Sequence, residues 1–200
     1  ADFSKYSDKE LLDVYNGIME TYCYVYPYGE PVTFMTKDFA EHMKPIFKGE
    51  DEEFYIMISS REKSFLQREE MDILKIAIIA KEKEQDDIKE ILKEHTRKYE
   101  WLPYDYGANH YNLTHFEREL EKLLELEIDE IKNKFDFLKD YERSTKEKQE
   151  KLKEKYSISD DEDSLYSVVR LSYYLIDSKK EYFTKIHWYS ERVFSEIAKR

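Results

Sequence analysis

Apolar residues recur every three or four positions along most of this chain, which is the spacing of an amphipathic α-helix. Ser7 and Glu10 have the spacing of a capping box, so a helix of about four turns is predicted to begin after Ser7. The stretch YCYVYPYGEP is predicted to end it, because Pro27, Gly29 and Pro31 interrupt helices and disfavour a long strand. Short helices are expected over residues 39–47 and from residue 51 onward.

A second capping box, Ser64 to Gln67, precedes FLQREEMDILKIAIIAKEKEQ. Residues 73–80 of this stretch are apolar on nearly every side of a helix, and a helix that is apolar all round is buried all round. We therefore expect it to be the central helix. One more amphipathic helix, DDIKEILKEHTRKY, is predicted to follow it.

The 93 residues after Gly107 contain neither glycine nor proline, so long helices are expected there. A third capping box, Thr114 to Glu117, predicts a helix over 114–155 whose polar end, beyond Tyr141, projects into water. Ser159 or Asp160 is expected to cap a helix over 160–199. The predicted fold is an all-α single domain over 1–200, with short helices and turns in 1–107 and a long antiparallel helical hairpin in 108–200.

Composition narrows the class of protein. Charged residues make up 39% and aromatic residues 16%, and the abundance of rings argues against disorder. The net charge of −12 and the absence of long runs of Lys or Arg alone disfavour nucleic-acid binding, which usually needs a basic face. The single Cys23 excludes an intrachain disulfide, indicates a reducing compartment, and is expected to be a buried small apolar residue.

No apolar run is long enough to cross a membrane and the N-terminus has no signal-peptide pattern, so a cytoplasmic protein without membrane association is expected. The first residue is not methionine, and the helical pattern continues to the last residue without a stop signal. We therefore expect a piece of a longer protein.

Candidate chemistry is sparse. A metal site is one interpretation of His110 and His115, which have Asp105 and Glu117 nearby. Zinc sites need three or four converging ligands, however, and a loop histidine beside a histidine at a helix start explains the same pattern. No phosphate-binding loop, dinucleotide fingerprint or nucleophile elbow occurs. We expect this chain to have no catalytic residue, no metal and no cofactor of its own.

Rings gather at residues 22–28, 99–111 and 188–189, and they either line a ligand pocket or fill the places where loops meet helices. Filling is the commoner use of such rings. The candidate ligand-binding residues are Tyr24, Tyr104, Tyr106, Tyr111 and Trp188. In the loop between the two predicted helices, Trp101 and Leu102 are expected to anchor the joint, while Tyr104, Tyr106 and Tyr111 face a cleft.

Several blocks of the sequence resemble the helical region of the phosphoenolpyruvate-utilising enzymes, a superfamily that includes phosphoenolpyruvate synthase, pyruvate phosphate dikinase and rifampin phosphotransferase. The resemblance is to the segment that precedes the swivelling phosphohistidine domain, and it spans nearly the whole chain. The blocks are SDKELLDVYNGIMETYCYVYPYGEP, SFLQREEMDILKIAIIAKE, HTRKYEWLPYDYG followed by LTHFERELEKL, and RLSYYLIDSKKEYFTKIHWYSERVFSEIAKR.

The resemblance implies a non-catalytic helical domain of a phosphotransferase-like protein, with the swivelling phosphohistidine domain as partner and a small-molecule substrate. The family's phosphohistidine lies in a glycine-rich segment. Thr114 and His115 lack those glycines, so we expect the phosphocarrier to lie outside this chain. The competing interpretation is a structural or protein-interaction bundle without a small ligand.

Overall fold

The computed structural model describes residues 2–82, 87–104 and 110–200, with the side chains of 28–30 excepted. Its described residues form helices and connecting turns with no strand, which confirms the all-α prediction. The elements are η1 (Phe3–Lys5), α1 (Asp8–Met43), η2 (Lys44–Phe47), α2 (Asp51–Ile58), α3 (Phe65–Glu82), α4 (Ile88–Tyr99), α5 (Leu113–Leu124), α6 (Ile128–Lys139), α7 (Tyr141–Lys155) and α8 (Asp160–Ile197).

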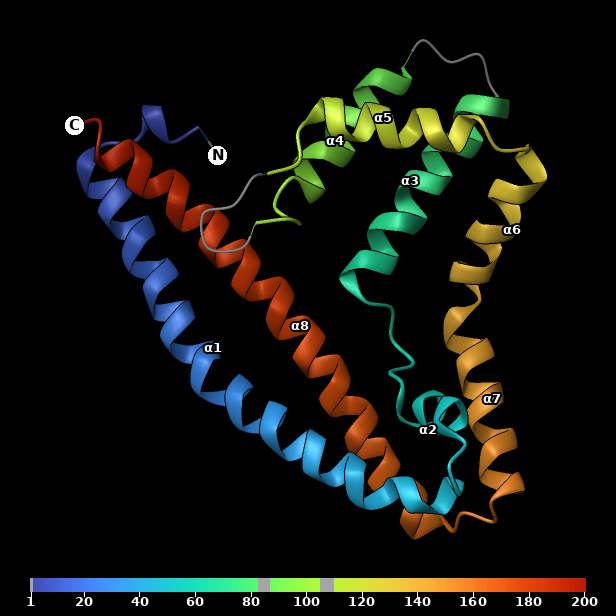
Figure 1. Ribbon diagram of the computed structural model, residues 1–200. Helices are drawn as coiled ribbons and strands as arrows, with labels where there is room; N and C mark the ends of the chain where they lie inside the picture. The colour runs from blue at the N-terminus through green and yellow to red at the C-terminus, as the bar shows by residue number, and fades with distance from the viewer. Residues whose placement is uncertain (1, 83–86, 105–109) are drawn as a thin grey trace.

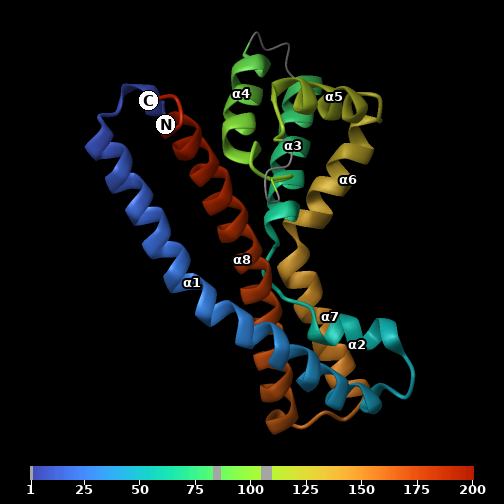
Figure 2. The same ribbon diagram turned by 60° about the vertical axis from the view of Figure 1, so that its left-hand side comes forward.

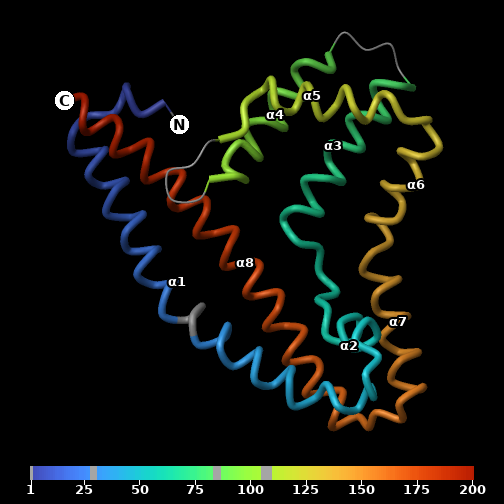
Figure 3. The backbone as a smooth tube through the Cα atoms, viewed as in Figure 1, coloured from blue at the N-terminus to red at the C-terminus, as the bar shows by residue number. Residues whose placement is uncertain are grey.

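The helices form two arms that meet at one end (Figure 1). The chain descends through α1, ascends through α3, crosses in α4 and α5, descends again through α6 and α7, and returns along α8. Seen from a second direction, α1 still lies along α8, and the two chain ends are close together (Figure 2). The tube in Figure 3 shows the antiparallel course of α1 and α8 along most of their length.

The longest antiparallel helix pair therefore consists of α1 and α8, from the two ends of the chain. The sequence analysis predicted such a pair within residues 108–200 instead. We call the line along which α1 packs against α8 the seam. Three contacts fix its register: Tyr15 meets Phe194, Tyr22 meets His187, and the Tyr166 hydroxyl donates to the Met43 carbonyl oxygen at 3.3 Å. The expectation of a helix over 160–199 is confirmed by α8, but its long partner is α1.

The prediction of short elements before Gly107 is wrong for α1, which runs through 36 residues and contains both Pro27 and Pro31. Each proline removes a backbone donor from the helix interior. Burial of the α8-facing side offsets that cost, because Leu11, Thr36, Ala40 and Met43 are all buried. The helix expected at 39–47 is the end of α1 continued by η2.

The single helix predicted over 114–155 is three helices, α5, α6 and α7. The chain turns at residues 125–127 and again at Asp140 without glycine or proline. Leu126 is pinned at the first turn because its carbonyl oxygen accepts a hydrogen bond from the Lys81 ammonium at the end of α3. The turn sends α6 back along α3, so tertiary packing overrides a continuous apolar stripe.

Three of the predicted helix starts are confirmed. Ser7 and Ser159 form capping boxes with Glu10 and Glu162, and Ser64 exchanges hydrogen bonds with Gln67 at 2.9 and 3.1 Å. The capping box at Thr114 is wrong, because Asn112 caps α5 by accepting from the His115 N–H at 3.0 Å. Asparagine is among the preferred N-cap residues and lies two positions earlier.

The expectation that the end of the 114–155 segment projects into water is also wrong. One side of α7 packs against α2 through the buried residues Thr145, Gln149 and Leu152. Gln149 is 1% exposed, and its amide donates to the carbonyl oxygens of Ile56 and Ser59 at 3.0 and 2.9 Å. The buried Gln149 amide thus holds α7 against α2 at a place where the sequence has no apolar stripe.

The main core surrounds α3, as predicted for the central helix. Ile73, Leu74, Ile76 and Ala77 of α3 are buried against α4, α5 and α6. Trp101 joins this core at 4% exposure, and its indole N–H donates to the Lys98 carbonyl oxygen at 2.7 Å. Trp101 is therefore the anchor of the loop after α4, while Leu102 is half-buried beside it. A second core cluster lies where α1, α2, α7 and α8 meet.

Candidate functional site: an aromatic groove

The candidate site is a groove of about 410 Å³ between α1, α8 and the segment after α4; we call it the aromatic groove. Its volume is within the range of small-molecule sites. It exists because Phe65 at the start of α3 and Tyr104 after α4 contact Asp177 and Trp188 of α8 on a different side from the one that α1 covers. The lining residues are Tyr22, Tyr26, Phe65, Leu102, Pro103, Tyr104, Lys179, Lys180, Phe183, Thr184 and His187.

One wall is a cluster of rings from α1 and α8. Tyr22 and Tyr26 lie one helical turn apart and stack with centroids 5.8 Å apart. Phe183 presents its edge to both, at 5.3 and 5.9 Å, and His187 lies 5.9 Å from Tyr22. Edge-to-face pairs at these separations hold one another in place. The wall therefore offers a preformed apolar surface that remains partly open, since Tyr26 is 47% exposed.

The opposite wall comes from the loop after α4. Tyr104 is buried, its ring lies 5.5 Å from Trp188, and its hydroxyl donates to the Glu191 carboxylate at 3.2 Å. Burial, and then the negative charge of Glu191, raise the pKa of Tyr104. The phenol therefore stays neutral at physiological pH and fixes the loop to α8.

The rim of the groove adds positive charge to a chain whose net charge is −12. Lys179 and Lys180 line the groove together with the Thr184 hydroxyl. The Lys179 ammonium lies 3.3 Å from the Thr33 hydroxyl oxygen on α1, which orients it across the seam. Two ammonium groups beside aromatic faces favour an anionic ligand with a flat apolar body.

Asp177 lies one turn before these lysines and faces α3, where its carboxylate accepts from the Phe65 N–H at 3.4 Å. Burial raises its pKa, and that effect outweighs the backbone hydrogen bond and the charge of Lys180.

The predicted ligand residues separate in the structure. Tyr104 lines the groove, and Trp188 lies behind it at 8% exposure. Tyr24 is on α1 but is 71% exposed and outside the groove. Tyr111 does not line the aromatic groove, and its ring stacks on His115 with centroids 3.6 Å apart. Tyr106 lies outside the described residues.

The sequence analysis missed Tyr22, Tyr26 and Phe183 as a set. Tyr22 and Tyr26 are four residues apart and so share one side of a helix, which was a usable signal once α1 is continuous. Cys23, expected to be buried, is exposed between them because its position on the helix points away from α8.

The histidine pair does not converge on a metal site. His115 belongs to the first turn of α5, and His110 is exposed and lies 5.0 Å from the Trp188 ring. Asp105 lies outside the described residues. Among the residues that the structure describes, no three histidine, cysteine or carboxylate side chains gather closely enough to hold a metal ion. Over the same residues, no helix combines the length and apolarity needed to cross a membrane.

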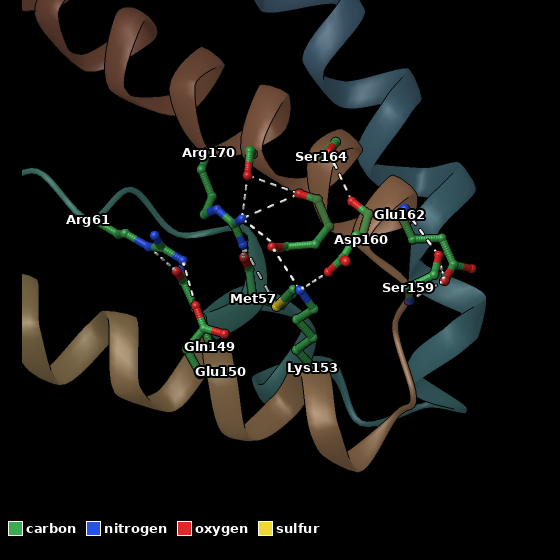
Figure 4. Close-up of polar contacts among 12 residues, drawn as sticks. Met57, Arg61, Gln149, Glu150, Lys153, Ser159, Asp160, Glu162, Ser164 and Arg170 are labelled. Atoms are coloured by element: carbon green, nitrogen blue, oxygen red, sulfur yellow. Dashed lines mark hydrogen bonds and ion pairs between the residues drawn. The ribbon is translucent and has the colours of Figure 1, made fainter.

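A second polar cluster surrounds the buried Arg170 (Figure 4). Its guanidinium donates to Asp163 at 2.8 Å, to Ser167 at 2.7 Å and to the Met57 carbonyl oxygen at 3.2 Å. Burial pushes the pKa of Asp163 upward, but the hydrogen bond and charge of Arg170 outweigh it and hold that pKa below its usual range. All these groups satisfy one another, so the cluster ties α8 to α2 and is not a candidate site.

Comparison of the chain with protein-family models, with curated proteins and with solved structures finds no match in any of the three.

Proposed function

We propose that this chain is a non-catalytic helical recognition domain whose aromatic groove binds a small anionic ligand with a flat apolar body. The observation behind the proposal is the combination of the Tyr22, Tyr26 and Phe183 rings with Lys179 and Lys180 around one groove. Rings supply most of the binding area in small-molecule sites, and a few charged groups orient the ligand. A flat body would pack on the exposed part of Tyr26 while its anionic group meets the lysines.

We further propose that the parent protein is phosphotransferase-like and uses phosphoenolpyruvate or a related phosphate donor. The support is the resemblance of the sequence blocks quoted above to the helical region of phosphoenolpyruvate-utilising enzymes. In that setting the groove holds the substrate, or the domain docks the swivelling phosphohistidine domain that delivers phosphate. The phosphate-carrying histidine then belongs to the partner domain, and His115 stays a helix-start residue.

The groove is tested by titrating the chain with 2-naphthoate, a flat aromatic carboxylate, and following the fluorescence of Trp188 and Trp101. Saturable binding in the sub-millimolar range is expected, and Phe183→Ala should weaken it by about tenfold because the ring that fixes both tyrosines is lost. Lys180→Gln should weaken binding of 2-naphthoate but not of the uncharged 2-naphthylmethanol.

Tyr55→Ala is the matched control. Tyr55 is 58% exposed and lies on α2, at the other end of the molecule, so its loss should leave the titration unchanged. Circular dichroism of each variant verifies that the fold is retained. Absence of binding at several millimolar, or equal affinity in Phe183→Ala, would refute the groove as a ligand site.

A second function, a protein-interaction bundle, is favoured by a different observation. Among the residues that the structure describes, most of the exposed large apolar side chains belong to α1 and α8. Exposed apolar side chains that form a contiguous patch are typical of a surface that another chain covers.

A further inference from the structure

The exposed apolar surface of this protein is concentrated on one helical pair. Among the described residues, seven of the exposed large hydrophobic side chains lie on α1 and eight on α8, and the other three are Tyr55, Leu66 and Phe137. The middle of α1 also carries little charge, because Glu30 is the only charged residue between Thr21 and Thr36. Solvent-exposed helices ordinarily present charged residues, so this composition indicates a surface that is covered in the functional state.

Two rows with heptad spacing run along this pair. The row on α8 is Val168, Leu175, Tyr182 and Tyr189, which are 56%, 44%, 55% and 44% exposed. The row on α1 is Ile18, Val25, Val32 and Phe39, of which the first three are half-buried and Phe39 is 45% exposed. A seven-residue apolar repeat is the signature of a helix that packs along another helix. Ile18 also packs against the Leu11 and Val193 cluster, so the α1 row borders the α1–α8 seam, whereas the exposed α8 row lies outside it.

The rows lie on the same side of the seam. On α1, the seam passes through Leu11, Tyr22 and Ala40; Tyr26 is displaced from it toward the aromatic groove, and the row of Val25 and Val32 is displaced the opposite way. Helical phase gives the same result for α8, where Thr184 is on the groove side of the seam and the Leu175 row is opposite. We call the surface between the two rows the outer face.

The register of the α1–α8 seam also places the residues of the two rows at matching heights along the helix axes. Tyr22 meets His187, and Tyr166 meets Met43, so residue numbers that add up to about 209 lie opposite each other. The pairs Ile18 with Tyr189, Val25 with Tyr182, Val32 with Leu175, and Phe39 with Val168 each fall within about 3 Å of that level along the helix axis. The outer face is thus four layers deep, and every layer combines a larger side chain with a smaller one.

We propose that the outer face binds the outer face of a second copy of this chain, forming a two-fold symmetric four-helix bundle. With the two-fold axis parallel to the helices, α1 of one copy lies beside α8 of its partner, and all neighbouring helices are antiparallel. Each layer then meets the same layer, so the larger side chain of one copy faces the smaller one of the other, which is how bundle cores interdigitate.

The available area fits a dimer. Phe39, Val168, Leu171, Leu175, Tyr182 and Tyr189 are each about half exposed and contribute roughly 100 Å² apiece. With the half-buried row on α1, the outer face offers roughly 600–800 Å² per copy, close to the 800 Å² per partner of a standard stable interface. A monomer rarely leaves an apolar patch of this size open to water.

Sedimentation equilibrium of the full chain under reducing conditions, from about 1 to 100 μM, tests the proposal. The expected mass is twice the 24.5 kDa of the chain. Tyr182→Glu and Leu175→Glu should each raise the dimer dissociation constant by at least about tenfold, because they place a charge in the centre of the interface. The matched controls Leu66→Glu and Phe137→Glu introduce the same charge at residues 56% and 62% exposed on α3 and α6, and they should remain dimeric.

Helicity by circular dichroism confirms that each variant is folded, and Val168→Lys replaces any glutamate variant that is not. A chain that sediments as a monomer at 100 μM overturns the proposal, including the case in which a helix of another protein occupies the outer face. A dimer that withstands all the outer-face substitutions, or that is lost equally in the controls, also overturns it. These outcomes are independent of naphthoate binding in the aromatic groove.

Discussion

Replacing Gln149 by leucine is expected to lower the free energy of unfolding by about 2 kcal/mol. The side chain is 1% exposed, and its oxygen accepts from the Arg61 guanidinium at 2.7 Å while its amide holds two carbonyl oxygens at the end of α2. Leucine has a similar size but cannot make these hydrogen bonds.

The size of this loss depends on which other hydrogen bonds the partners of Gln149 can still make. The Ile56 carbonyl oxygen keeps the Ser59 hydroxyl at 2.8 Å, and Arg61, which is partly exposed, can turn to water or to Glu150. The Ser59 carbonyl oxygen loses its side-chain donor, and a buried carbonyl without a partner costs about 1–3 kcal/mol. Apolar contacts of leucine in the α2–α7 interface offset part of the loss, at about 25 cal/mol per Å² buried.

Equilibrium unfolding in urea, followed by circular dichroism at 222 nm, measures the change. Gln149→Ala should lose more than Gln149→Leu, because it adds a cavity. Lys146→Ala, at an exposed position of the same helix, should stay within about 0.5 kcal/mol of the parent. A Gln149→Leu variant as stable as the parent would refute the reasoning, since it would mean that the amide is replaceable by apolar packing.

Three further outcomes are expected. Trp101→Ala should lower the free energy of unfolding by about 3–5 kcal/mol in the same urea assay, and an unchanged midpoint would show that the ring is no core anchor. Burial raises the pKa of Asp177, so at a pH above that raised pKa the ionised carboxylate lowers the stability of the fold. Asp177→Asn, whose side-chain oxygen can still accept from the Phe65 N–H, should therefore raise Tm at pH 7. This advantage should disappear as the pH falls below about 4, where Asp177 is protonated in the folded and unfolded states. Incubated with radiolabelled ATP or phosphoenolpyruvate, the isolated chain should acquire no acid-labile label; label that disappears in His115→Ala would contradict the assignment of the phosphocarrier to another domain.

Local chemistry at helix starts was predictable because it involves residues three apart in sequence. Ser7 and Ser64 cap their helices as their Glu10 and Gln67 partners indicated, and Ser159 is one of the two caps expected for α8, whereas Asn112 replaces the expected Thr114. The apolar run of α3 likewise identified the centre of the main core, since no exposed helix tolerates apolar residues on every side.

Structure that depends on contacts between segments far apart in the sequence was not predictable from the same patterns. Proline propensity argued against a continuous α1, but contact with α8, more than 100 residues away in sequence, outweighs it. The apolar stripe of 114–155 keeps its phase through Leu124, Ile128 and Ile131, so no periodicity signal marks the turn at 125–127. For the candidate site, Tyr104 and Trp188 were predicted because they belong to ring-rich segments of the sequence, whereas Tyr22 and Phe183 could be recognised only once the α1–α8 register was known.

The pairing of α1 with α8 also governs how this chain is made. During synthesis α1 leaves the ribosome before α8, which begins only at residue 160, so 116 residues separate the two helices. At roughly 5–20 residues per second, α1 waits about 6–23 s before α8 starts to emerge. Its apolar side chains, with almost no charge between residues 21 and 36, stay without their native partner for that time. Nascent α1 should therefore be a preferred substrate for ribosome-associated chaperones, and closing so long a loop makes the α1–α8 seam the last part of the molecule to form.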